Sequence, residues 1–172
     1  DQLAEQSGKL AHYFQSIGIT TGDCIAGLLP RTPELLITIL ATWRIGAIYQ
    51  PLFTACESKA IEHRIETAGT RLIVTNSEQR TKLNEIENTE ILTIHAQGKV
   101  SKDADFWTEI AKYSSHFSSE MLGFEDDFLM MFTSGTTGLA KSVPVPLKAV
   151  LAFKEYMRHA VDLREEDSFW NL

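Results

Sequence analysis

Short apolar runs alternate with helix-like segments along most of this sequence, and the alternation limits the folds that the chain can adopt. Such runs lie at residues 24–29, 47–53, 71–75 and 90–95, and the run at 71–75 is rich in β-branched residues. Their lengths are typical of buried strands. A helix between two strands returns the chain to the same end of the sheet, so the strands pair in parallel. We therefore expect an α/β fold with a mostly parallel sheet flanked by helices.

Helices are predicted before, between and after these strands, at residues 2–17, 33–45, 57–68, 77–86, 106–113 and 147–161. Thr32 and Pro33 suit the N-cap and first position of the second helix, and Gly18 suits a left-handed C-terminal cap of the first. Residues 33–45 are apolar almost all round, which predicts a helix buried on most faces. Residues 96–105 are expected to form a polar loop.

Composition excludes several classes of protein. The 172 residues are 44% hydrophobic and 23% charged, and their formal net charge is −7. This charge argues against a nucleic-acid or anionic-membrane partner. No apolar run approaches the roughly 20 residues of a membrane span. The two cysteines are not in a C-x-x-C pattern and the five histidines lack metal-ligand spacing, so we expect a cytoplasmic protein without disulfides or a metal centre of its own.

A polar, glycine-containing segment follows a further apolar run, Phe128–Phe132, that fits a buried strand. Gly135 and Gly138 let the backbone take positive φ, so that consecutive N–H groups converge on an anion. Lys141 adds a mobile positive charge suited to a polyphosphate. The hydroxyl groups of the segment belong to Thr133, Ser134, Thr136 and Thr137. Such hydroxyls suit phosphate oxygens or the water shell of Mg²⁺, so the pattern predicts a loop that grips phosphates.

The spacing from Gly135 to Lys141 comes close to a Walker A loop but fails twice. Ala140 stands where that pattern requires a glycine before the lysine. Pro144 and Pro146 follow and disfavour the helix that a Walker loop needs behind its lysine. We therefore expect the chain to leave the loop in an extended conformation.

Residues Thr133–Lys141 (Thr-Ser-Gly-Thr-Thr-Gly-Leu-Ala-Lys) resemble the signature loop of the adenylate-forming, or AMP-binding, enzymes. We call these residues the signature loop. The sequence departs from the family pattern at Ala140, where proline is usual, and at Ser142, where glycine is usual. The resemblance implies that the β- and γ-phosphates of ATP are held by Thr133, Ser134, Gly135, Thr136, Thr137, Gly138 and Lys141.

Weaker resemblances lie outside the loop. Gly22–Ala26 and Thr32–Leu52 resemble scaffold segments of the same family, and Asp167–Asn171 resembles a segment of acetyl- and medium-chain acyl-CoA synthetases. These matches imply that residues 1–172 are a partial N-terminal AMP-binding domain, truncated at both ends. The catalytic lysine of the family is then expected downstream, and the 172 residues alone are expected to be inactive.

The resemblance implies an activity for the complete protein. It would join a carboxylic acid to ATP, with Mg²⁺, to give an acyl-adenylate, and then transfer the acyl group to coenzyme A, as in fatty acid metabolism. Two alternatives stay open at this point. One is an adenylation domain that loads a carrier protein, and the other is a non-catalytic module that binds a nucleotide.

Overall fold

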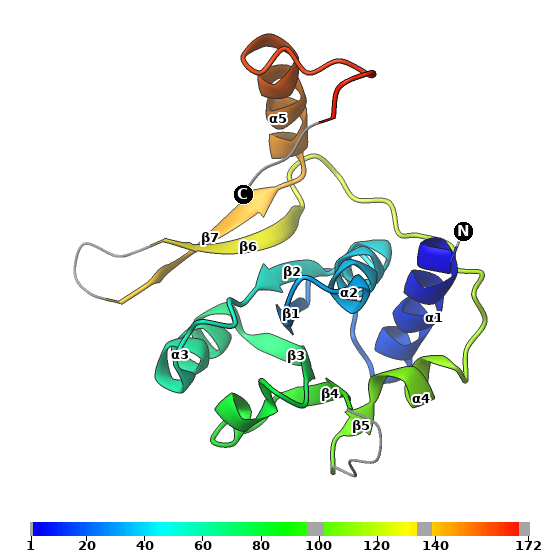
Figure 1. Ribbon diagram of the computed structural model, residues 1–172, viewed down its shortest axis with the longest axis vertical. Helices are drawn as coiled ribbons and strands as arrows, with labels where there is room; N and C mark the ends of the chain where they lie inside the picture. Colours follow the sequence, from blue (N-terminus) through cyan, green and yellow to red (C-terminus); the bar gives the residue numbers. More distant parts are fainter. Residues whose placement is uncertain (1, 96–101, 134–138, 169–172) are drawn as a thin grey trace.

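The fold is an α/β sheet, seen in a computed structural model that describes residues 2–95, 102–133 and 139–168 (Figure 1). Within these residues, seven strands form one sheet in the order β5-β4-β3-β1-β2-β6-β7. All neighbours pair in parallel except β6 and β7, which are antiparallel. The predicted mostly parallel sheet is therefore confirmed. The strands are β1 Cys24–Leu28, β2 Ile48–Pro51, β3 Thr70–Asn76, β4 Glu90–Ile94, β5 Ala104–Asp105, β6 Asp127–Thr133 and β7 Lys141–Pro146.

Five α-helices accompany these strands in the described chain: α1 Gln2–Ser16, α2 Pro33–Arg44, α3 Ser58–Ala68, α4 Phe106–Ile110 and α5 Lys148–His159. Gly18 and Gly69 follow α1 and α3 with φ of 82° and 61°, as left-handed caps require. Thr32 takes the N-cap position of α2, although its side chain makes no capping hydrogen bond.

Four local predictions are wrong. The sequence predicts a buried strand at residues 128–132, but this run lies in β6, in which no residue is buried and Met131 is 37% exposed. The predicted helix at residues 77–86 is only a short 3-10 helix, η1 Arg80–Leu83, in which Leu83 is the one buried residue, so too little apolar surface supports a longer helix. Ala104 and Asp105 form β5 rather than loop. Helix α2 buries one face only, since Leu36 is 53% exposed.

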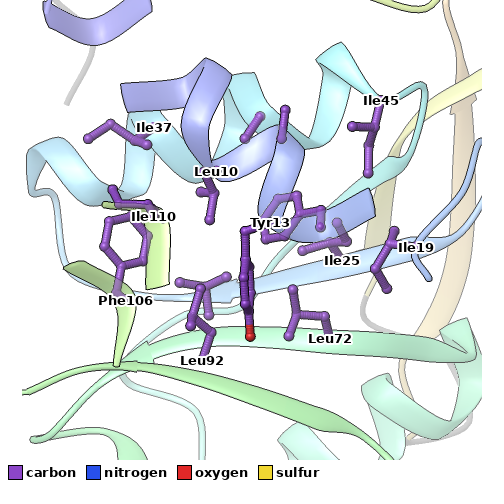
Figure 2. Packing of buried hydrophobic residues seen from close by; sticks show 14 of the residues in the cluster. Leu10, Tyr13, Ile19, Ile25, Ile37, Ile45, Leu72, Leu92, Phe106 and Ile110 are labelled. Carbon is purple, nitrogen blue, oxygen red and sulfur yellow. The ribbon is translucent and has the colours of Figure 1, made fainter. Parts of the chain in front are cut away.

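The hydrophobic core lies on both faces of the sheet. On one face, α1, α2 and α4 pack against residues such as Ile25, Leu72 and Leu92 (Figure 2). On the other face, Ile61 and Ile65 of α3 join a second cluster of strand residues. Because both faces are covered, successive residues of β1 and β3 are apolar. This explains the continuous apolar runs in the sequence.

The β6–β7 hairpin and α5 extend from the sheet instead of packing into these clusters (Figure 1). Helix α5 has no buried residue, and Phe153 on it is 62% exposed. None of the described helices combines the length and apolar character needed to cross a membrane.

Substituting Gly8 by alanine is expected to destabilise the fold, although alanine favours a helix more than glycine by roughly 0.5–1 kcal/mol. Gly8 is buried in α1, and a Cβ there would lie 2.1 Å from the Ser115 carbonyl oxygen. Relief of that overlap costs about 1–3 kcal/mol. Urea unfolding should therefore show a lower stability for Gly8→Ala. Gln15→Ala, at an exposed position of α1, is the control, and a more stable Gly8→Ala protein would contradict the contact with Ser115.

Candidate functional site

The two described ends of the signature loop lie side by side, where β6 ends and β7 begins. Thr133, the last residue of β6, pairs with Lys141, the first residue of β7. Both residues are exposed. Because β6 runs parallel to β2, Thr133 lies at the carboxyl edge of the parallel strands, where open α/β sheets bind ligands.

Five of the seven predicted phosphate-binding residues lie outside the described residues: Ser134, Gly135, Thr136, Thr137 and Gly138. Thr133 and Lys141 are brought together. Among the residues that the structure describes, no carboxylate forms an ion pair with Lys141. Its charge is thus available to an anion from solvent.

The chain leaves the signature loop as a strand, and this confirms the predicted extended exit. Residues Lys141–Pro146 form β7, and the next helix begins only at Lys148. Pro144 and Pro146 fit because β7 is the edge strand of the sheet, where a residue without an N–H group leaves few ladder hydrogen bonds unmade. A Walker-type loop, which requires a helix directly behind its lysine, is excluded.

The start of β6 is anchored by α2. The indole Nε1–H of Trp43 donates a hydrogen bond of 2.8 Å to the Phe128 carbonyl oxygen, and the two rings lie 5.5 Å apart. Tyr49 of β2 pairs with Leu129. Burial raises the pKa of Tyr49, which keeps this residue neutral beside the strand. The start of β6, which we call the root of the hairpin, is therefore fixed to α2 and β2.

The other end of the hairpin contacts α3. The Nε2–H of His63 donates to the carbonyl oxygen of Ala140 over 2.9 Å. The guanidinium of Arg64 lies over the ring of Phe132, 5.7 Å from its centroid. Two consecutive residues of α3 therefore contact Phe132, directly before the loop, and Ala140, the residue of the loop next to Lys141.

Helix α3 is itself tied to the sheet by a buried amide. Gln50 of β2 is fully buried, and its Nε2 donates to the Arg64 carbonyl oxygen over 3.1 Å. Its Oε1 accepts from Thr70 at 2.5 Å and from Cys24 at 3.7 Å. Burial raises the pKa of the Cys24 thiol to about 11 although the Thr70 hydroxyl partly offsets this. The neutral thiol can thus act as a donor.

Sequence reasoning missed these supporting residues. It predicted a helix at residues 57–68 and found no metal-ligand spacing among the histidines, but it gave no role to His63 or Arg64. His63 and Ala140 are 77 positions apart, and no local pattern links them. The described residues contain no cluster of three or more His, Cys, Asp or Glu side chains that could hold a metal ion.

Comparisons with known proteins agree with this geometry. The model of the AMP-binding enzyme family matches residues 1–172. Acetyl-coenzyme A synthetase 1 of Candida glabrata is 31% identical over 98% of this chain and 27% of its own length. The acetyl-coenzyme A synthetase of Bacillus subtilis is 28% identical over 98% of this chain and 30% of its own. The chain thus spans less than a third of these relatives.

Solved structures show the same architecture. A Brucella canis acyl-CoA synthetase superposes with a TM-score of 0.93 and 50% identity, over 99% of this chain and 32% of its own. ATP-bound MatB from Rhodopseudomonas palustris gives 0.78 at 24% identity, over 91% of this chain and 31% of its own, and this likeness concerns the fold alone. Together with the match of the family model over the whole chain, these findings show that the chain belongs to the AMP-binding enzyme family.

Proposed function

We propose that the protein containing this chain activates a carboxylic acid with ATP and transfers the acyl group to coenzyme A. The pairing of Thr133 with Lys141 at the carboxyl edge of the sheet carries the proposal. It sets a hydroxyl beside an ammonium group that pairs with no described carboxylate, at the two ends of a segment whose sequence suits phosphate. An acetyl-coenzyme A synthetase and an acyl-CoA synthetase share this region, and the resemblance of Asp167–Asn171 adds medium-chain acids to the candidate substrates.

In the first step, a carboxylate oxygen attacks the α-phosphorus of ATP, and the bond to the β-phosphate oxygen breaks to release pyrophosphate. The signature loop would hold the β- and γ-phosphates, with the hydroxyls and N–H groups of Thr133, Ser134, Gly135, Thr136, Thr137 and Gly138 as donors. Lys141 would neutralise the charge that develops on pyrophosphate. Mg²⁺ would enter with the nucleotide and be held by its phosphates.

The remaining parts of the machinery, including a catalytic lysine, would lie outside these 172 residues, which would be inactive alone as a partial N-terminal domain. Coenzyme A would then attack the acyl carbon through its thiol and release AMP.

Two free cysteines, one of them buried, support a reducing compartment such as the cytoplasm.

Acid-dependent exchange of labelled pyrophosphate into ATP tests the proposal on the full-length protein. We expect exchange with at least one acid from a panel of short- and medium-chain carboxylates, and thioester formation when coenzyme A is added. Exchange without transfer to coenzyme A would favour a carrier-protein acceptor. Nucleotide binding without exchange for any acid would favour a non-catalytic module and refute the proposal.

A further inference from the structure

The sheet holds the hairpin firmly only at its root. Within the described chain, β2 pairs with β6 at Tyr49 and Leu129 alone, and the indole of Trp43 reaches Phe128. Phe132 and Thr133 lie beyond these contacts, where the hairpin leaves the sheet (Figure 1). Some other element must therefore set the position of the far end of the hairpin.

Helix α3 supplies that support. His63 fixes a backbone atom, the carbonyl oxygen of Ala140, next to Lys141. Arg64 covers the ring of Phe132, next to Thr133, and its Nη1 also donates to the Ala60 carbonyl oxygen at 2.7 Å, which restrains the guanidinium. Phe132 lies in β6 and Ala140 directly before β7, so the two contacts together limit both the tilt of the hairpin and its distance from the sheet.

The support is rigid because α3 cannot slide along the sheet without cost. The carbonyl oxygen of Arg64 accepts from the buried Gln50 amide, whose own oxygen is occupied by Thr70 and Cys24. A shift of α3 would leave a buried amide N–H unpaired, which is costly. The Gln50 side chain and α3 thus connect β1, β2 and β3 to the described ends of the loop.

We propose that α3 positions the two described ends of the signature loop, Thr133 and Lys141, for adenylate formation, with His63 as the positioning residue beside Lys141 and Arg64 as the one beside Thr133. The inference rests on the proposed function, which it extends to residues that touch no substrate. A neutral hydrogen bond corresponds to about a five- to tenfold change in a rate or equilibrium. The loss should appear in kcat more than in KM for ATP, because the loop grips phosphates most tightly as pyrophosphate forms.

Three variants of the full-length protein test this role by acid-dependent pyrophosphate exchange, each with a thermal unfolding midpoint. His63→Leu removes the donor and should lower kcat about five- to tenfold, with KM for ATP changed less than about twofold. His63→Gln keeps an amide N–H near the position of Nε2 and should retain most of the activity.

His12→Leu is the matched control. The Nε2 of His12 contacts a backbone carbonyl oxygen, that of His116, over the same 2.9 Å, but it lies on α1, away from the hairpin. The His12→Leu variant should lose about as much stability as His63→Leu and keep the kcat of the wild type. An unchanged kcat in His63→Leu, or equal losses of kcat in His63→Leu and His12→Leu, would overturn the positioning role. A wild-type protein without exchange would instead refute the proposed function, and this inference with it.

Discussion

Replacing Lys141 by alanine should lower the rate of acyl-adenylate formation by about 10²–10³-fold, the usual loss when one donor to developing charge is removed. Lys141 begins β7 opposite Thr133, and no described carboxylate competes for its ammonium group. Its charge would therefore act on the leaving pyrophosphate. Transfer of the acyl group to coenzyme A takes place after pyrophosphate has formed, so that step should slow much less.

Separate pre-steady-state measurements of the two half-reactions distinguish this role from a general loss of structure. Lys9→Ala removes the same charge from α1, at a partly exposed position on the body of the domain, and should leave both rates near those of the wild type. Equal losses in the two half-reactions of Lys141→Ala would contradict a role confined to pyrophosphate.

The sequence alone predicted those features of the fold that are decided by residues close together in the chain. Apolar runs indicated the central strands, because both sheet faces are covered, and the prolines at 144 and 146 indicated an extended exit from the loop. The outcome at residues 77–86 shows the limit of that reasoning. Helix-compatible residues were present there, but Leu83 is the only apolar residue of the segment that is buried, and burial depends on what packs above the segment.

Contacts between distant segments could not be predicted. The buried face of α2 carries Thr38 and Thr42, whose hydroxyls donate to carbonyl oxygens of their own helix at 2.8 Å, while Leu36 is exposed. The prediction that this helix is buried on most faces therefore failed, because apolar side chains alone do not show which face of a helix packs against the sheet. At the candidate site, the loop was predicted from its own residues, whereas the contact of His63 with Ala140 follows only from the crossing of α3 and β7.

Replacing Phe106 by alanine should reduce the free energy of unfolding by about 3–5 kcal/mol, as for other buried phenylalanines. Phe106 is the first residue of α4 and is fully buried in the cluster formed by α1, α2 and the sheet (Figure 2). The adjacent Trp107 is 41% exposed, so Trp107→Ala removes a larger ring yet should cost much less. Urea unfolding followed by circular dichroism compares the two variants. Equal losses would contradict the docking of α4 through Phe106, because exposure and not ring size is expected to decide the cost.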